Sequence, residues 1–322
     1  MRSVCLALTL LAACAAPPSD SGARADPIVG GYDVTDGGFA AVYMLRSEFD
    51  NGVRAGCTAT LITPRTLLTA AHCVDPRKAG ATSVQLFAVG LAVAPIATDP
   101  AWVQATEARF HPQYVPSDLF TYDIAVVLLP AASSVTPVPY SARDATGLMG
   151  QPLTAVGYGI ASEGATDYGT RRAVGLTVRD VTAKHVVLGD QTAKGICDGD
   201  SGGPSLVLFG DGVTRVIGVH SYKQPSGGCH DGLDTRVDLF KDFVRQWVSE
   251  KEGPTCGEDG LCKSSGCASV DPDCKVPDPT LPRLEPELGA AAQGKSAGCS
   301  AAGAGPLWLL APAGRRRRRR RG

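Results

Sequence analysis

Three residues that lie far apart in the chain carry side chains that could act together in acyl transfer. His72 lies in "TAAHC", Asp123 opens the apolar run "DIAVVLL", and Ser201 lies in "CDGDSGGP". A serine hydroxyl is a poor nucleophile until a base accepts its proton, and histidine titrates where it can accept that proton and return it. An aspartate can hold the histidine ring in the required tautomer.

Each of these residues also has an ordinary structural interpretation when it is taken alone. Glycines around a short polar side chain are typical of a tight turn, which would account for Ser201. A histidine beside a cysteine is usually structural, and an aspartate that opens a buried strand commonly accepts hydrogen bonds from backbone donors. The three residues together, in this order and with these flanking sequences, favour catalysis.

Strands must bring the three side chains together. From Ile28 to about Lys251, short apolar runs rich in Val, Ile, Leu and Thr are interrupted by Gly, Pro, Asp and Ser. Such runs predict an all-β barrel or a sandwich pair. The exception is "DLFKDFVRQWV", residues 238–248, whose apolar residues recur at helical spacing and predict a closing helix.

At these motifs the chain resembles the trypsin-like serine peptidases of the chymotrypsin fold. The matching sequences, spread over residues 28 to about 248, are "IVGG" at Ile28, "TAAHC", "DIAVVLL" and "GDSGGP". The resemblance implies two six-stranded antiparallel β-barrels and a C-terminal helix. It also implies an endopeptidase that cleaves protein or peptide substrates through an acyl-enzyme intermediate on the Ser-His-Asp triad, without a cofactor or a metal ion.

The resemblance assigns roles to the residues around the triad. The backbone N–H groups of Gly199 and Ser201 would stabilise the oxyanion. Asp200 would form a buried ion pair with the α-amino group of Ile28, which is released when a zymogen is cut before that residue. Ser221 matches the serine that supports the triad aspartate.

The sequence before Ile28 departs from the family. The activation cut usually follows Arg or Lys, whereas Ile28 follows Asp26 and Pro27. We therefore expect signal removal after Ala25, followed by loss of the Asp-Pro dipeptide to a separate peptidase.

The specificity pocket departs from the trypsin pattern as well. The residue six positions before the nucleophile, which selects Arg or Lys when it is Asp, is Gly195 here. Gly232 would lie near the pocket bottom, and the opposite wall would be formed by Ser221, Tyr222 and Lys223. His220 and Lys223 add positive charge, and some relatives that cleave after glutamate carry a histidine at the position of His220. Two P1 preferences remain open: an acidic side chain, or a small to medium apolar one.

The eleven cysteines divide into groups. The resemblance implies two disulfides, Cys57 with Cys73 and Cys197 with Cys229. A module at 254–275 holds four more, for which we expect two disulfides of unknown connectivity: Cys256, Cys262, Cys267 and Cys274. Their spacing lacks the C-x2-C pairs of zinc ribbons, although four cysteines could bind zinc, and Asp271 with Asp273 could bind calcium.

Residues 1–25 have the layout of an export signal and a short pro-segment, since one basic residue precedes an apolar run. The sequence "LAAC" resembles a bacterial lipobox. Cys14 is therefore either a lipidated first residue or part of a signal that is cleaved nearby.

The other end of the chain predicts attachment to the cell envelope. A Pro-rich linker, 276–297, leads to a tail, 298–322, with Gly298-Cys299, an apolar run and seven arginines. The run is short for a membrane span, and arginines after it favour a cytoplasmic stop. The tail resembles myxobacterial-type sorting tails, in which the cysteine, here Cys299, is processed and attached by sorting machinery. We expect a bacterial protein that is either secreted or held at the cell surface or outer membrane, with membrane association through tail or lipid.

The charge distribution argues against nucleic-acid binding. The formal net charge is -1, and without the terminal arginines the remainder is mildly acidic. The main alternative to a peptidase is a catalytically silent, protease-like binding module at the cell surface. Because all three triad residue types and the oxyanion glycine are present, the sequence favours the enzyme.

Overall fold

Short antiparallel strands dominate the computed structural model, which describes residues 27–35, 37–90, 102–118, 121–189, 194–223, 228–230 and 232–253. The predicted signal segment, Cys14, the four-cysteine module, the linker and the tail with Cys299 lie outside these described residues. Among the described residues, no helix combines the length and the apolar character needed to cross a membrane.

The first sheet is formed by the N-terminal half of the described chain. Its strands are β2 (Val42–Phe49), β3 (Arg54–Leu61), β4 (Thr66–Thr69), β5 (Val84–Val89), β6 (Val103–Gln104), β7 (Glu107–Phe110) and β8 (Ala125–Leu128). They pair antiparallel in the order β6-β5-β2-β3-β4-β8-β7. The strand β8 is buried along its whole length, which explains its unbroken apolar sequence "AVVL".

The second sheet contains β1 (Tyr32–Asp33), β9 (Pro152–Gly157), β10 (Arg172–Val181), β11 (His185–Leu188), β12 (Pro204–Leu208), β13 (Thr214–Lys223) and β14 (Gly232–Arg236). Its order is β1-β10-β11-β14-β13-β12-β9, and β9 also pairs with β10. That pairing closes six strands into a barrel. The two expected barrels are confirmed, although the first sheet has seven strands in the described part of the chain and no pairing there closes it.

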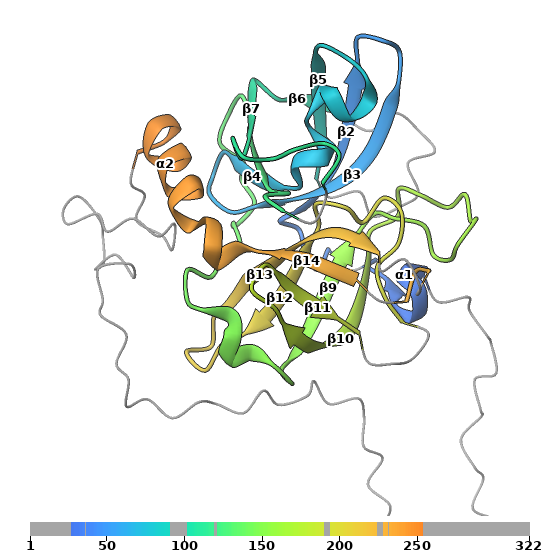
Figure 1. Cartoon of the computed structure of the whole chain (residues 1–322), viewed down its shortest axis with the longest axis vertical. Helices are drawn as coiled ribbons and strands as arrows, with labels where there is room; N and C mark the ends of the chain where they lie inside the picture. The colour runs from blue at the N-terminus through green and yellow to red at the C-terminus, as the bar shows by residue number, and fades with distance from the viewer. Residues whose placement is uncertain are drawn as a thin grey trace, which may run out of the picture. The chain divides into compact units, whose positions relative to one another are not determined.

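Helical segments are few and short. They are α1 (Pro27–Gly30), α2 (Lys241–Lys251) and the 3-10 turns η1 (Ala71–Cys73), η2 (Pro76–Ala79), η3 (Ala145–Leu148) and η4 (Val237–Phe240). The predicted closing helix is thus confirmed as η4 followed by α2, which runs beside the first sheet (Figure 1).

Helix α2 connects the two sheets. It follows β14 of the second sheet, but its fully buried Trp247 donates a hydrogen bond from Nε1 to Thr66 Oγ1 on β4, at 3.1 Å. Beyond the helix, Glu252 accepts hydrogen bonds from Thr63 and from the Arg65 backbone N–H. The end of the described chain therefore fastens the second barrel to the first.

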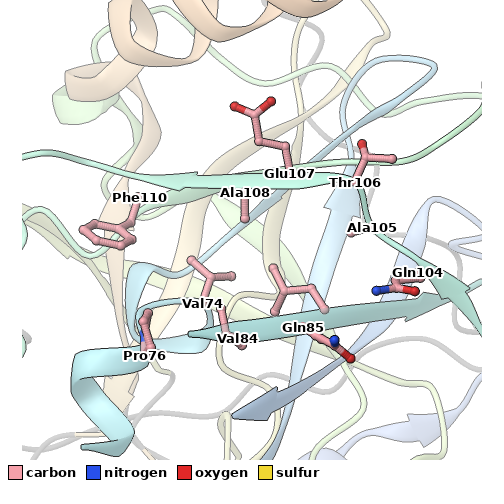
Figure 2. A pocket seen from close by; sticks show the side chains of 11 residues that line it. Val74, Pro76, Val84, Gln85, Gln104, Ala105, Thr106, Glu107, Ala108 and Phe110 are labelled. Carbon is pink, nitrogen blue, oxygen red and sulfur yellow. The ribbon is translucent and has the colours of Figure 1, made fainter. Parts of the chain in front are cut away.

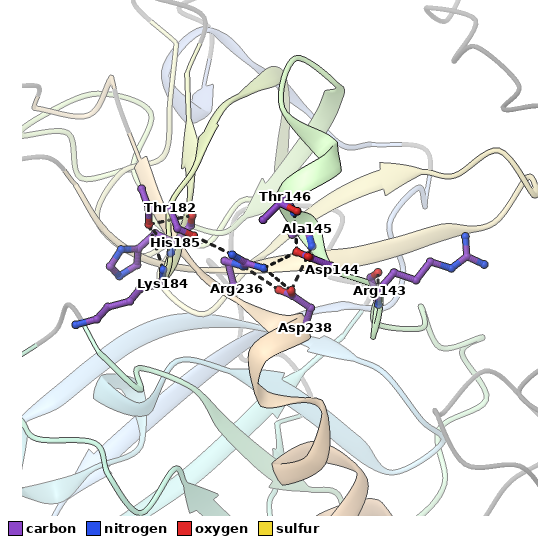
Figure 3. Close-up of polar contacts among 10 residues, drawn as sticks. Arg143, Asp144, Ala145, Thr146, Thr182, Lys184, His185, Arg236 and Asp238 are labelled. Atoms are coloured by element: carbon purple, nitrogen blue, oxygen red, sulfur yellow. Dashed lines mark hydrogen bonds and ion pairs between the residues drawn. The ribbon is translucent and has the colours of Figure 1, made fainter. Parts of the chain in front are cut away.

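A buried arginine, Arg236, forms a polar network with residues of η3, η4 and the turn between β10 and β11 (Figure 3). Arg236 donates from Nη2 to Asp238 at 2.6 Å and to Asp144 at 2.9 Å, and from Nη1 to the Thr182 carbonyl at 2.8 Å. Asp238 also accepts from the Ala145 N–H. Because every contact uses a charged group, this network holds η3 and the β10–β11 turn against β14.

Candidate active site

The histidine and aspartate predicted from the sequence meet at one edge of the first sheet. Strands β4 and β8 are antiparallel and pair Thr69 with Ala125, so the end of β4 lies beside the start of β8. His72 follows β4 and Asp123 precedes β8. The His72 backbone N–H donates to Asp123 Oδ1 at 2.9 Å, and His72 Nδ1 lies 2.8 Å from Asp123 Oδ2.

The second barrel completes the surroundings of Asp123. Ser221 Oγ, on β13, donates to Asp123 Oδ2 at 2.5 Å, and Thr235 Oγ1, on β14, donates to the Asp123 carbonyl at 3.0 Å. Burial would raise the pKa of the Asp123 carboxyl, but the charge of His72 and the hydrogen bonds from His72 and Ser221 hold it below its usual value. The carboxylate therefore stays ionised beside the ring.

Ser201 lies in a turn between the two barrels, where a first-sheet residue holds it. Thr58, on β3, donates from its N–H to the Ser201 carbonyl at 2.8 Å and from Oγ1 to the Gly199 carbonyl at 2.9 Å. Cys73 Sγ, next to His72 in the chain, lies 3.6 Å from the same Ser201 oxygen. In the described residues no hydrogen bond joins the Ser201 hydroxyl to the His72 ring, a contact that is often long before substrate binds.

Gly199 occupies a position that only glycine can take. Its φ is +96°, which side chains disfavour. A Cβ atom there would lie 2.7 Å from the Tyr168 ring and 2.8 Å from the Gly159 Cα. The turn before Ser201 thus depends on the missing side chain.

Asp200 is fully buried but has a different environment from Asp123. Its Oδ1 accepts from the Gly159 N–H and its Oδ2 from the Cys197 N–H, both at 2.8 Å. Burial raises the pKa of Asp200 to about 6, although these hydrogen bonds and the charge of His220 lower it. Among the described residues, no ion pair neutralises this carboxylate.

Ile28 is already packed into the second barrel, where its side chain is fully buried. The next residue, Val29, accepts a hydrogen bond from the Gly195 N–H at 3.0 Å. Ile28 itself has a φ of +44°, so α1 is a strained bend rather than a regular helix. A β-branched residue rarely takes a positive φ, and the strain costs on the order of 1–3 kcal/mol.

The two glycines assigned to the specificity pocket are tightly packed. A Cβ on Gly195 would lie 2.3 Å from the His230 carbonyl oxygen, and one on Gly232 would lie 2.6 Å from Ile196 Cγ1. Neither position therefore has room for a side chain without a shift of its neighbours. Tyr222, which the sequence analysis also assigned to this pocket, is partly buried, and burial raises its pKa to about 12.

Behind these glycines, His220 forms a second histidine–aspartate pair. His220 Nδ1 lies 2.8 Å from Asp234 Oδ1, and both side chains are fully buried. Within the described residues, His220 Nε2 and Asp234 Oδ2 have no hydrogen-bond partner. The pair matches His72–Asp123 in its atoms and distance, but it lies in the interior of the second barrel.

Lys223 does not extend freely into solvent. Its Nζ lies 3.1 Å from the Asp198 carboxylate, and the lysine side chain is only 28% exposed. Sequence reasoning did not single out Asp198, Asp234, Thr58 or Thr235. None of them carries a local signal, because each acts across a strand pair or between barrels.

The structure contains both disulfides that the resemblance implies, Cys57–Cys73 and Cys197–Cys229. The sulfur atoms of Cys57 and Cys73 and a ring nitrogen of His72 lie within 4.8 Å of one another. These residues do not fit a metal site, because both sulfurs are committed to a disulfide and neither is a thiolate.

A hollow of about 330 Å³ opens elsewhere on the first sheet, between β5 and β7 (Figure 2). Val74, Val84 and Ala108 are among its apolar lining residues, and Glu107 lies on its rim with its carboxylate pointing away from β5. None of the three predicted catalytic residues lines this hollow. It is therefore separate from the site of the predicted acyl transfer.

Comparisons with known proteins agree with this architecture. The trypsin family profile matches residues 28–244. Brachyurin of Leptuca pugilator is 30% identical over 210 residues, covering 59% of this chain and 86% of brachyurin. Vitamin K-dependent protein C of Mus musculus is 28% identical over 231 residues, covering 63% of this chain, but this chain spans only 48% of that protein.

Among solved structures, HL collagenase superposes with a TM-score of 0.58 at 23% identity, covering 71% of this chain and all of the collagenase chain. At that identity the likeness shows the fold alone. The family profile covers far more than half of the chain and spans the motifs that contain Ile28, His72, Asp123 and Ser201. The chain therefore belongs to the trypsin family of serine endopeptidases, a class of hydrolases.

Proposed function

We propose that the chain is an exported serine endopeptidase in which Ser201 attacks the scissile peptide bond, His72 acts as base and acid, and Asp123 orients His72. The observation that carries this proposal is the environment of the Asp123 carboxylate. It is fully buried, and both of its oxygens form hydrogen bonds, with His72 and Ser221 as the partners. A buried charge with this arrangement is costly unless its partner is charged during function. An imidazolium formed in the reaction is such a partner.

The proposed reaction uses these groups in the following order. Ser201 Oγ adds to the substrate carbonyl carbon while His72 Nε2 takes its proton. The oxyanion faces the Gly199 and Ser201 N–H groups, and His72 then returns the proton to the leaving amine, which produces the acyl-enzyme. Water attacks the acyl group by the same steps and restores Ser201.

Covalent labelling with a fluorophosphonate probe tests the proposal, because the probe reacts only with an activated serine. We expect the mature enzyme to be labelled and the Ser201→Ala and His72→Ala variants to remain unlabelled. Thr214→Ala, an exposed position at the start of β13, serves as a control that should label normally. A folded mature protein that is not labelled at any pH between about 5 and 9 would support the alternative, a silent binding module at the cell surface.

Maturation to Ile28 is the second part of the proposal. The free α-amino group of Ile28 would pair with Asp200, whose carboxylate lacks a neutralising partner among the described residues. The strained φ of Ile28 supports a cut between Pro27 and Ile28. This torsion includes the carbonyl carbon of Pro27, so cleavage of the Pro27–Ile28 bond removes the strain. N-terminal sequencing of active enzyme should read Ile28, and any other first residue would contradict this route.

For substrate choice, we propose an acidic P1 side chain. Gly195 gives no negative charge to attract Arg or Lys, and the packing around it excludes an acid there. Lys223, assigned to the wall of the candidate pocket, has a side chain that is 28% exposed, and its positive charge would pair with a P1 carboxylate. A P1 peptide library tests this: strong cleavage after Leu or Ala with none after Glu or Asp would favour the apolar alternative.

Localisation and domain boundaries complete the proposal. We propose export through the segment 1–25, a peptidase domain at 28–251, a disulfide module at 254–275, and attachment through Cys299 after the linker 276–297. Export from the cytoplasm is in keeping with the two disulfides of the peptidase domain. Mass spectrometry of the purified surface protein would identify the processed C-terminus and any lipid on Cys14.

A further inference from the structure

The ion pair between Asp198 and Lys223 lies at the rim of the candidate specificity pocket. Lys223 ends β13 and is paired in register with Gly232 of β14, the residue assigned to the bottom of the candidate pocket. Asp198 directly precedes Gly199 in the oxyanion turn. The Lys223 Nζ lies 3.1 Å from the Asp198 carboxylate and 3.9 Å from Cys229 Sγ, so the pair lies over the Cys197–Cys229 disulfide.

The two partners differ in how exposed their side chains are. The Asp198 backbone is fixed, since its carbonyl accepts from the Ile160 N–H at 2.9 Å, but its side chain is 69% exposed. An exposed ion pair of this kind contributes little free energy and exchanges its partners readily. Lys223 is the more buried partner, and its ammonium group is the positive charge that a substrate would meet.

We infer that Asp198 competes with an acidic substrate side chain for Lys223. Asp198 forms an ion pair with Lys223 in the free enzyme, and a P1 carboxylate displaces it when substrate binds. This inference rests on the proposed peptidase function and adds a residue that determines specificity. A substrate carboxylate replaces the Asp198 carboxylate with the same charge, so Lys223 keeps a partner. An apolar P1 side chain has no group that can bind the Lys223 ammonium, so the Asp198–Lys223 ion pair stays intact.

A double-mutant cycle on mature enzyme tests the inference, with kcat/KM measured for peptides that differ only in P1 Glu or P1 Leu. We expect Asp198→Asn to raise the Glu/Leu ratio about two- to fivefold, and Lys223→Gln to lower it by a similar factor. In the Lys223→Gln background, Asp198→Asn should have no further effect on the ratio. Asp242→Asn, which removes an exposed carboxylate paired with Arg245 on α2, is the matched control and should leave the ratio unchanged.

A second measurement separates this inference from the proposed chemistry. The Ser201→Ala chain, cut before Ile28, is titrated calorimetrically with acetylated tetrapeptides that end in Glu or in Leu. Asp198→Asn should strengthen binding of the Glu peptide alone, even if fluorophosphonate labelling shows that no serine is activated. If Asp198→Asn changes both peptides equally, or changes the ratio when Lys223 is absent, Asp198 only shapes the oxyanion turn and the inference is wrong.

Discussion

Asp123 and Asp200 are both fully buried aspartates, but their environments shift their pKa values in opposite directions. Asp123 accepts hydrogen bonds from His72 and Ser221 and lies beside the charge of His72, so its pKa lies below the usual value. In the described residues, Asp200 accepts hydrogen bonds only from backbone N–H groups. The effect of burial exceeds that of these hydrogen bonds and raises the pKa of Asp200 to about 6. At the residue scale, two equally buried carboxylates thus differ in the direction of their pKa shift because their hydrogen-bond and charge partners differ.

Ser221→Ala should weaken the active site without unfolding it. The Ser221 hydroxyl donates to the Asp123 carboxylate, and a hydrogen bond to a charged group contributes about 1.5–3 kcal/mol. We expect kcat/KM to fall by roughly ten- to a hundredfold. The variant should also have a higher Asp123 pKa than the original protein. The ionised Asp123 stabilises the fold above its unfolded pKa, and on acidification the variant should lose this stabilisation at a higher pH than the original protein does.

The matched control is Ser205→Ala, on the neighbouring strand β12. Ser205 is also fully buried, but its Oγ has no hydrogen-bond partner in the described chain. Its removal should leave kcat/KM within about twofold of the original. Equal losses in the two variants would mean that Ser221 acts only through packing.

Asp200 makes the stability of the uncut chain depend on pH. Because its folded pKa of about 6 exceeds the ordinary aspartate value of 3.8, the folded chain binds more protons than the unfolded chain between these values. The contribution of Asp200 to the free energy of unfolding therefore falls by up to roughly 3 kcal/mol as the pH rises from about 4 to 7. Urea unfolding of uncut Ser201→Ala chain, with and without Asp200→Asn, measures this slope. Identical slopes in the two chains would show that Asp200 is already neutralised.

At the scale of elements, paired strands and the loops beside them determine the space at the candidate specificity pocket. Gly195 faces the backbone of the Cys229–His230 segment, and Gly232 opens β14 against Ile196. His220 and Asp234 are register partners across β13 and β14. The strand β14, which carries Asp234, therefore leaves no volume for a side chain at Gly232, near the bottom of the candidate pocket.

Gly195→Asp should not create a trypsin-like enzyme. Its Cβ would lie 2.3 Å from the His230 carbonyl oxygen, so backbone has to move before the carboxylate can face the pocket. We expect a loss of about 1–3 kcal/mol in the free energy of unfolding and no cleavage after Arg or Lys. Gly175→Asp, on β10, is the control, because a Cβ there meets nothing within 4 Å. Efficient Arg or Lys cleavage by Gly195→Asp would refute this packing argument.

At the scale of the whole molecule, the site exists only between two barrels. His72 and Asp123 come from the first sheet, while Ser201 and Ser221 come from the second, and Thr58 bonds one to the other. Helix α2 adds a second link through Trp247 and Thr66. The barrels therefore need a fixed relative position for the proposed chemistry to occur.

Trp247→Ala should reduce stability and activity together. Trp247 is fully buried and bonded to the first sheet, and removal of such a side chain costs about 3–5 kcal/mol. Thermal unfolding and kcat/KM of the variant measure both effects. Leu239→Ala, at a 48% exposed position in η4, is the control and should change neither appreciably. Full activity in Trp247→Ala at low temperature would show that α2 does not position the barrels.

The sequence by itself predicted the all-β class, the closing helix and, through the resemblance, both disulfides, because periodicity and local motifs reflect the burial of neighbouring residues. It also identified His72, Asp123 and Ser201 as candidates from their flanking motifs. It could not reveal that Asp198 binds Lys223, that Asp234 pairs with His220, or that Thr58 bonds the turn at Gly199 and Ser201. These contacts join residues 14 to 141 positions apart, and only the pairing of strands and the meeting of the two barrels bring such side chains together.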